Sequence, residues 1–294
     1  MEYYQILDVE RLTGIKAHTI RIWEKRYALI VPHRTATNIR YYDDAQVKKI
    51  LNVATLIANG IKISKVAALS PTEFNKKLEE QFANTNNSNV NYISYINDLI
   101  SATLAVNETE FEKTFQLITT KLGIYEAMLN VVYPFLTKVG YMWTVDKSSS
   151  FQEHFATAII RQKIMVATDG LKPKKEKNKQ FLLYLPPDEW HEIGLLFANY
   201  IIRLHGHRTV YLGQNVPYES VEKLLSLIKT DYLLSFYVLS NSQANAHNNL
   251  VTILNSNKNV HLLLAGNQTF IDELHLPNKR YSAVNSVQSL LAYL

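Results

Sequence analysis

The stretch FLLYLPPDEWHEIG, residues 181–194, decides the fold of the C-terminal half of this chain. Its first five residues form a continuous apolar run, which is typical of a strand buried in a parallel sheet. A loop follows, and residues 193–204 then have the apolar spacing of a helix. The same alternation predicts strands over 209–212, 232–238, 261–264 and 281–284 and helices over 221–228, 244–254, 270–274 and 287–291. We therefore predict a doubly wound, flavodoxin-like α/β domain with five parallel strands over residues 171–294.

The first loop of this domain holds the leading candidate for a ligand site, because such domains bind ligands at the carboxyl ends of their strands. His191 stands in this loop, two residues after Glu189. A neutral imidazole can ligate a metal while a carboxylate holds its other ring nitrogen. The chain has no cysteine, which excludes disulfides and thiolate metal sites. A lone loop histidine is more often structural, so His191 alone leaves both interpretations open.

Residues 91–170 are predicted to form a four-helix bundle. Apolar residues recur at intervals of three and four over 92–106, 108–121, 125–143 and 151–168. Pro134 is expected to kink the third helix. Trp143 ends that helix, and Glu153 and His154 open the fourth. Taken singly, such a tryptophan is usually part of a core and such a polar pair usually lies on a surface.

Residues 1–82 are predicted to form a small basic domain with a helix-turn-helix and a wing. Of the net charge of +5, residues 1–80 carry +4, with 13 Lys or Arg against 9 Asp or Glu. Helices are expected over 4–12, 17–27, 43–57 and 63–69, with short β-prone pieces over 29–42. Residues 83–90 are rich in asparagine and predict a flexible linker. Because this linker directly follows the basic domain, no long helix that could form a coiled coil follows that domain. A homodimer or tetramer would therefore have to form through the rest of the chain.

The whole chain shows no apolar run long enough to span a bilayer and no signal-peptide start, so we expect a cytoplasmic protein without membrane contact. We find no set of nucleophile and base that would indicate an enzyme.

The N-terminal segment closely resembles the MerR family of winged-helix DNA-binding regulators over residues 3–70. The resemblance rests on TIRIWEKRY at 19–27, followed by Pro32, Arg34 and Arg40-Tyr41-Tyr42. It implies that the second helix enters the major groove of an operator in double-stranded DNA and that the wing grips phosphates. The residues implied for these contacts are Thr19, Arg21 and Arg26 on the helix and Arg34, Arg40 and Tyr41 on the wing. Ala28 and Asn38 stand where glycine is common in the family.

Two further motifs resemble those of MerR-type photoreceptor repressors that use adenosylcobalamin to sense light. Trp143, nine residues and then Glu153-His154 is similar to their Trp-x9-Glu-His signature. Glu189-x-His191-x-x-Gly194 is similar to the Asp-x-His-x-x-Gly motif of cobalamin-binding domains, with Ser235-Phe236-Tyr237 and Ala265-Gly266 in place of Ser-x-Leu and Gly-Gly. Four residues depart from these patterns: Thr144 where several members have histidine, Glu189 in place of aspartate, Tyr237 in place of leucine and Ala265 in place of glycine.

This resemblance implies a role for each matching residue. Trp143, Glu153 and His154 would cover the upper face of the cofactor. His191 would ligate the cobalt, with Glu189 holding its tautomer. Gly194, Ser235 and Gly266 would line the slot for the nucleotide tail, which Tyr237 and Ala265 would narrow.

The function implied is that of a transcription repressor that oligomerises with adenosylcobalamin in the dark and dissociates in light. One alternative keeps the fold but not the cofactor: a DNA-binding regulator with a degenerate pocket that a protein partner switches. A corrinoid-carrying methyltransferase subunit is a third reading of the C-terminal half, but it leaves the basic domain unexplained.

Overall fold

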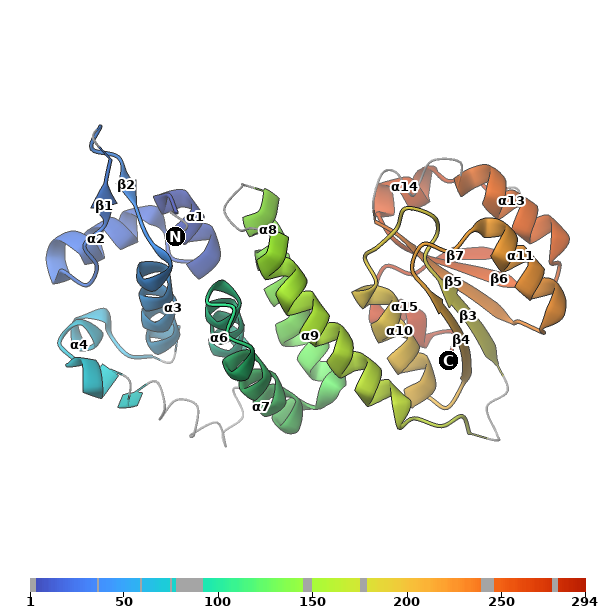
Figure 1. Cartoon of the computed structure of the whole chain (residues 1–294), viewed down its shortest axis with the longest axis horizontal. Coiled ribbons are helices and arrows are strands. Elements are labelled where there is room, and N and C mark those ends of the chain that lie inside the picture. The colour runs from blue at the N-terminus through green and yellow to red at the C-terminus, as the bar shows by residue number, and fades with distance from the viewer. Residues whose placement is uncertain are drawn as a thin grey trace. The chain divides into compact units, whose positions relative to one another are not determined.

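A computed structural model describes residues 4–35, 37–58, 60–74, 76–77, 92–144, 150–174, 179–238, 246–276 and 280–294. The chain divides into two compact units, Met1–Ile159 and Ile160–Leu294 (Figure 1). The predicted linker 83–90 lies outside the described residues. None of the described helices is both long enough and apolar enough to cross a membrane.

Unit 1 begins with the predicted basic domain, which we call the head. Its elements are α1 (Ile6–Thr13), α2 (Ala17–Tyr27), β1 (His33–Arg34), β2 (Arg40–Tyr41), α3 (Asp44–Ala58) and α4 (Ile63–Ala67). The strands β1 and β2 pair antiparallel across the β-prone segment. Asn38 has a φ of 66° in the hairpin and Ala28 a φ of 47° after α2, so both take the left-handed backbone that favours glycine.

The apolar positions that predicted the head helices form its core. Val9 and Leu12 of α1, Ile20 and Trp23 of α2, and Ile50 of α3 are all buried. Arg11, Arg21 and Lys25 face outward, because a helix places only every third or fourth residue on one side.

The remaining helices of unit 1 follow the predicted order. They are α6 (Tyr92–Leu104), α7 (Glu108–Ala127), the π-helix η1 (Met128–Val132), α8 (Tyr133–Thr144) and α9 (Ser150–Asp169), which continues into unit 2. Within α7, Gly123 leaves the helical conformation at a φ of 73°, in the gap that the sequence predicts between two helices. The irregularity expected at Pro134 takes the form of η1 just before it, where the N–H of Tyr133 reaches back to the carbonyl of Met128.

The head packs on these helices through polar contacts that the sequence did not predict. The Nζ atom of Lys138 in α8 donates to the carbonyl of Leu12 at 2.9 Å. From α6, the side-chain amide of Asn97 donates to the carbonyl of Leu51 at 3.3 Å and to Oγ1 of Thr55 at 3.1 Å. Helices α1 and α3 therefore meet α8 and α6 directly.

Unit 2 contains the five-stranded α/β fold that the sequence predicts. Its strands are β3 (Gln180–Tyr184), β4 (Arg208–Gly213), β5 (Tyr232–Tyr237), β6 (His261–Gly266) and β7 (Tyr281–Ala283), and its further helices are α10 (Ile193–Leu204), α11 (Tyr218–Leu227), α13 (Ala246–Ser256), α14 (Gln268–Glu273) and α15 (Val287–Leu291). The strands form one parallel sheet in the order β4-β3-β5-β6-β7. The predicted five-stranded parallel sheet is confirmed.

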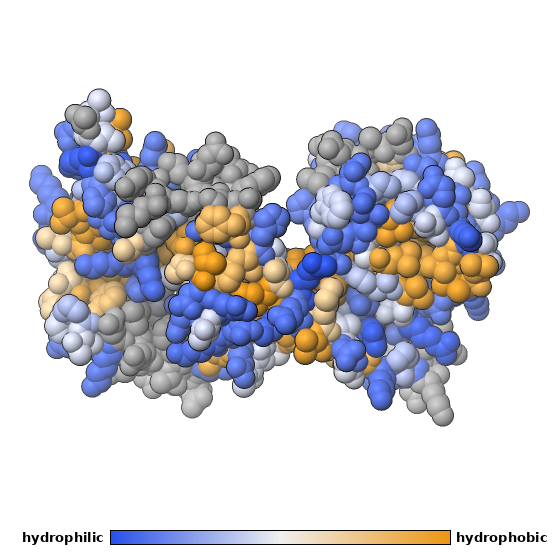
Figure 2. Space-filling view, viewed as in Figure 1, coloured by the Kyte–Doolittle hydropathy of each residue, from blue (hydrophilic) through white to orange (hydrophobic). Residues whose placement is uncertain are grey.

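Helices cover both faces of this sheet (Figure 1). Leu182, Leu233 and Leu262 point to the face on which α11 and α13 pack, and α10 packs on the other. The chain leaves β3 for β4 on one side and later returns to β5 on the other side of β3, so the carboxyl ends of β3 and β5 form the crevice where ligands of such folds bind. On the side of unit 2 seen in Figure 2, a band of hydrophobic residues is bordered by hydrophilic ones.

Candidate functional site

The loop between β3 and α10 is organised by one buried carboxylate, that of Glu189. Its Oε1 atom accepts the backbone N–H groups of Trp190 and His191, each at 3.1 Å. Its Oε2 atom accepts the N–H of Val238 at 2.7 Å, just after β5 ends. Glu189 is fully buried, so these bonds replace the water that a carboxylate otherwise needs. The loop is thereby joined to the ends of both strands at the crevice.

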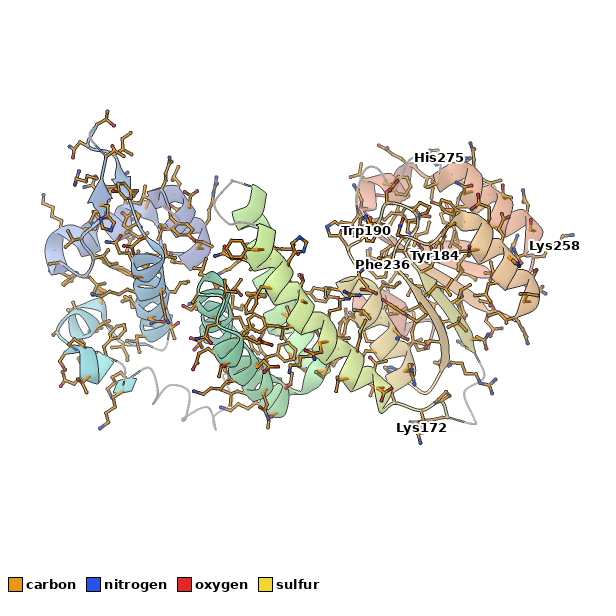
Figure 3. All side chains as sticks on the ribbon, viewed as in Figure 1. Lys172, Tyr184, Trp190, Phe236, Lys258 and His275 are labelled. Carbon is orange, nitrogen blue, oxygen red and sulfur yellow. The ribbon has the colours of Figure 1, made fainter. Side chains whose placement is uncertain are left out.

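His191 is held by the same carboxylate. Its Nδ1 atom lies 2.7 Å from Oε1 of Glu189, and its side chain is 52% exposed. An ionised carboxylate only accepts hydrogen bonds, so this contact favours a proton on Nδ1, and a neutral ring in that tautomer has its lone pair on Nε2. The structure thus brings together the two residues that the sequence predicted as a metal ligand and its partner. Trp190 between them is 57% exposed (Figure 3).

A second buried carboxylate, Glu192, was not predicted from the sequence. Its Oε1 atom accepts the hydroxyl of Tyr211 at 2.7 Å, and its Oε2 atom accepts the side-chain amide of Gln214 at 2.7 Å. The Nε atom of Arg161, from α9, lies 2.6 Å from the same Oε2 atom. Burial and the bond to Glu192 raise the pKa of Tyr211, so its hydroxyl stays a donor. Glu192 therefore ties the histidine loop to β4 and to α9.

Gly194 does not line an open slot in this structure. It lies in the first turn of α10, and a Cβ atom added to it would lie 2.8 Å from Cε1 of Phe236 in β5. The absence of a side chain is thus used for packing between the helix and the sheet. Ala265 pairs with Phe236 across β5 and β6 and shares its face of the sheet.

Ser235 and Tyr237 lie on the opposite face of β5, since side chains alternate along a strand. Both are fully buried. The sequence motif predicts that Ala265 and Tyr237 narrow one common slot. In the structure, the two side chains lie on opposite faces of the sheet.

Gly266 has a φ of 113°, and a Cβ atom added to it would overlap the carbonyl of Tyr237. The next residue, Asn267, donates its N–H to that carbonyl at 2.7 Å. The absence of a side chain at Gly266 thus allows the ends of β5 and β6 to lie close together.

The predicted cap residues lie in unit 1. Trp143 is in the last turn of α8, and its side chain lies outside the described part of the structure. Glu153 and His154 are in the first turns of α9, with Nδ1 of His154 3.8 Å from Oε2 of Glu153, and the histidine side chain is 76% exposed. Nothing described here assigns them a ligand, and their role stays a prediction.

The predicted DNA contacts of the head fall into two groups. On α2, Arg21 and Arg26 are exposed and Thr19 is half-buried. In the hairpin, Arg34 donates to the side chain of Asn38 at 2.7 Å, and Tyr41 stacks on His33 with ring centroids 5.2 Å apart.

Arg40, by contrast, is used inside the head. Its Nε atom lies 3.0 Å from Oε2 of Glu24, a carboxylate only 7% exposed that also accepts the hydroxyl of Tyr42. The position of Arg40 therefore indicates a structural role beside any contact with phosphates.

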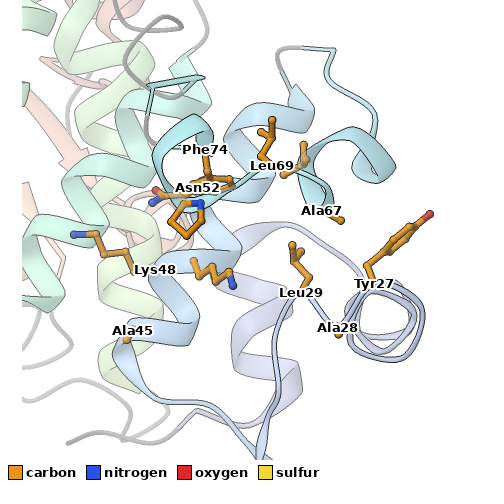
Figure 4. A pocket seen from close by; sticks show the side chains of 12 residues that line it. Tyr27, Ala28, Leu29, Ala45, Lys48, Asn52, Ala67, Leu69 and Phe74 are labelled. Carbon is orange, nitrogen blue, oxygen red and sulfur yellow. The ribbon is translucent and has the colours of Figure 1, made fainter.

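The head also contains a cavity of about 360 Å³ between the end of α2, α3 and α4 (Figure 4). Apolar side chains such as Leu29, Leu69 and Phe74 line it together with Lys48 and Lys49. It belongs to the packing of the head, and we assign no ligand to it.

The donor set at His191 limits the kind of metal site that is compatible with the structure. Within the described ranges, no three or more His, Cys, Asp or Glu side chains are grouped so as to hold a metal ion. A single imidazole backed by a buried carboxylate is insufficient for a bare ion but suits an axial position on a metal already held by a macrocycle. The residues of this loop thus fit the axial side of a corrinoid.

Comparison with known proteins relates both parts of the chain to proteins of known kind. Residues 4–72 match the family described as MerR HTH family regulatory protein, so they form a MerR HTH domain. The chain is homologous to the HTH-type transcriptional repressor CarH of Myxococcus xanthus, with 26% identity over 78% of this chain and 77% of that protein. It is also homologous to the repressor CarA of the same organism, with 27% identity over 79% of this chain and 76% of that protein.

Among solved structures, the monomethylamine corrinoid protein of Methanosarcina barkeri aligns with a TM-score of 0.54. The alignment covers 66% of this chain and 94% of that protein at 16% identity, which shows a shared fold.

Proposed function

We propose that this chain is a DNA-binding transcription repressor whose α/β domain binds a corrinoid, with His191 as the residue that would hold its cobalt. The proposal rests on the contact between Oε1 of Glu189 and Nδ1 of His191, which lie 2.7 Å apart at the crevice of the sheet. The same chain has a MerR HTH domain. The names of the two homologous repressors support the regulatory role. A methyltransferase subunit would share only the fold and would leave the head without a purpose.

Glu189, His191 and Glu192 have different tasks in this proposal. His191 presents the lone pair of a neutral ring, and Glu189 keeps the proton on Nδ1. Glu192 holds the loop to α9 through Arg161. Trp143, Glu153 and His154 remain the proposed cover of the opposite face of the cofactor. When bound in its adenosyl form, the corrinoid supplies a cobalt–carbon bond that light can break.

We further propose that the cofactor controls assembly into dimers or tetramers and thereby DNA binding. A ligand can shift this equilibrium only if it binds the assembled state more tightly. Paired heads on one oligomer gain affinity for a two-fold operator through their effective concentration, and dissociation removes this gain. Thr144 follows Trp143 where several photoreceptors have histidine, so a second imidazole ligand after photolysis is not part of the proposal.

The experiment mixes the purified full chain, in darkness, with adenosylcobalamin and separately with adenosylcobinamide, which lacks the nucleotide. Size-exclusion chromatography with absorbance detection reports corrinoid retained per chain and the size of the assembly, before and after illumination. We expect one corrinoid per chain and a larger assembly in the dark. His191→Ala should change the absorption spectrum of the bound corrinoid, because the cobalt loses its imidazole ligand.

A second candidate is a DNA-binding regulator that binds no corrinoid and responds to a protein partner. The fully buried Tyr237 in the crevice favours it. If neither corrinoid is retained by the folded wild-type chain, the corrinoid proposal is wrong and this candidate stands.

A further inference from the structure

Four hydroxyl-bearing side chains gather in the core below the histidine loop. They are Tyr184 at the end of β3, Tyr218 in the first turn of α11, and Ser235 and Tyr237 of β5, and we call them the tyrosine cluster. All four are buried. The hydroxyls of Tyr218 and Tyr237 are 3.2 Å apart, and the ring of Tyr184 meets that of Tyr218 edge-on with centroids at 6.5 Å. Figure 3 labels Tyr184 within unit 2.

The cluster is not explained by hydrogen bonding alone. The hydroxyl of Tyr184 interacts with those of Ser235 and Tyr237, yet in the described part of the chain neither Tyr184 nor Ser235 has a partner that meets full hydrogen-bond geometry. Burial raises the pKa of Tyr237 well above its ordinary value and raises that of Tyr184, so these hydroxyls keep their protons. An apolar core would avoid the cost of burying such groups. The three tyrosine rings of the cluster fill space in the core.

That space lies in the crevice between the carboxyl ends of β3 and β5. On one face of the sheet, the fully buried side chains of Tyr184 and Tyr237 lie at the carboxyl ends of β3 and β5. On the other, the ring of Phe236 packs against Gly194. The carboxylate of Glu189 bonds to Val238 across the top, and Asn267 holds the carbonyl of Tyr237. Buried rings thus fill the crevice on the face of Tyr184 and Tyr237, whereas Phe236 on the other face is partly exposed and the side chain of His191 is 52% exposed.

We propose that the tyrosine cluster makes this site selective for corrinoids without a lower nucleotide, with Tyr237 as the specificity-determining residue. This inference rests on the proposed function. A nucleotide base is at least as large as a tyrosine ring, and a close-packed interior has no spare room for it. Entry of a nucleotide would require the Tyr237 side chain to leave the core, which reduces affinity about 10- to 100-fold. The corrinoid ring would bind at the exposed His191, so its binding would not displace Tyr237.

The test compares adenosylcobinamide with adenosylcobalamin on the full-length wild-type chain in darkness, by absorbance titration. We expect the wild type to bind adenosylcobinamide at least about tenfold more tightly. Tyr237→Leu opens the crevice and should reduce or reverse this preference by a similar factor. Tyr237→Phe keeps the ring without its hydroxyl and should retain the preference, which separates volume from hydrogen bonding.

Each outcome decides between the two proposals. Wild-type protein that binds adenosylcobalamin as tightly as adenosylcobinamide overturns the inference but leaves the proposed function intact. The same holds if folded Tyr237→Leu keeps the wild-type preference. Retention of neither corrinoid defeats the proposed function itself. The wild-type comparison needs no variant, so it remains decisive even if Tyr237→Leu does not fold.

Discussion

The Oε1 atom of Glu189 lies 2.7 Å from Nδ1 of His191, and the carboxylate is fully buried while the imidazole is half exposed. The pair places a basic ring nitrogen at the surface and its orienting charge inside the protein. We predict that Glu189→Gln lowers corrinoid affinity about 10- to 100-fold, as loss of such an orienting partner does in metal sites. Absorbance titration measures the change. Asp188→Asn, at the exposed neighbouring position, is the control, and equal effects of both variants would contradict the assigned role.

The buried carboxylate of Glu192 should be more important for stability than its ion-pair partner. Glu192→Ala leaves the hydroxyl of Tyr211 and the amide of Gln214 without their acceptor, and we expect the free energy of unfolding to fall by about 3 kcal/mol. Arg161→Ala should cost only about 1 kcal/mol, because that side chain is 45% exposed and screened by water. Urea denaturation measures both, with the exposed Glu219→Ala as control. Similar losses for the two variants would be inconsistent with this account.

Replacing Arg21 by alanine should weaken DNA binding, whereas replacing Arg40 by alanine should reduce the stability of the head. Arg21 is exposed on α2, so Arg21→Ala should weaken binding to a DNA duplex and reduce the dependence of the affinity on salt by about one phosphate contact, without changing the melting temperature of the protein. Arg40→Ala removes the ion-pair partner of the nearly buried Glu24, and the head should lose about 2 kcal/mol of stability. Fluorescence anisotropy over a salt series and thermal unfolding separate these effects. An unchanged melting temperature of Arg40→Ala would refute the structural role.

Asp98 in α6 should make the stability of unit 1 depend on pH. Burial raises the pKa of this carboxyl to about 8, while Lys48 lowers it and Glu110 raises it. Its Oδ2 atom is enclosed without a partner among the described residues, although the side chain as a whole is only partly buried. The folded state therefore holds a proton that the unfolded state releases near pH 4. Stability should fall as the pH rises from about 4 to 8.

Asp98→Asn removes this titration. We expect it to stabilise the protein by about 2 kcal/mol more at pH 8 than at pH 5, a value that allows for partial exposure. Melting temperatures across that range measure the difference, and Glu108→Gln at an exposed position is the control. A gain for Asp98→Asn that does not change with pH would contradict the assigned pKa.

Residues that are close in sequence were predicted well. The apolar runs of β3, β5 and β6 predicted buried parallel strands because both faces of such strands are covered. Glu189 and His191 are two residues apart, so their contact depends on the conformation of one loop. The left-handed backbone at Asn38 follows from the turn that joins two short strands.

Contacts between distant segments were not predicted. Arg161 and Glu192 meet from different elements, and so do Arg40 and Glu24. In the sequence, nothing beside these charged residues distinguishes them from charged residues that are simply solvated. Their pairing depends on helix packing and strand order, which no local pattern encodes.

The sequence by itself determined the order of the elements, the MerR character of the head and the residues of the histidine loop, since hydrophobic periodicity and local motifs act over a few residues. Only the tertiary structure decided what fills the crevice beside that loop. Tyr184, Tyr218 and Tyr237 come from three separate elements, and Phe236 reaches Gly194 from a neighbouring strand. Whether a buried space is open depends on the close packing of side chains that the fold brings together, and that packing exists only once the chain is folded.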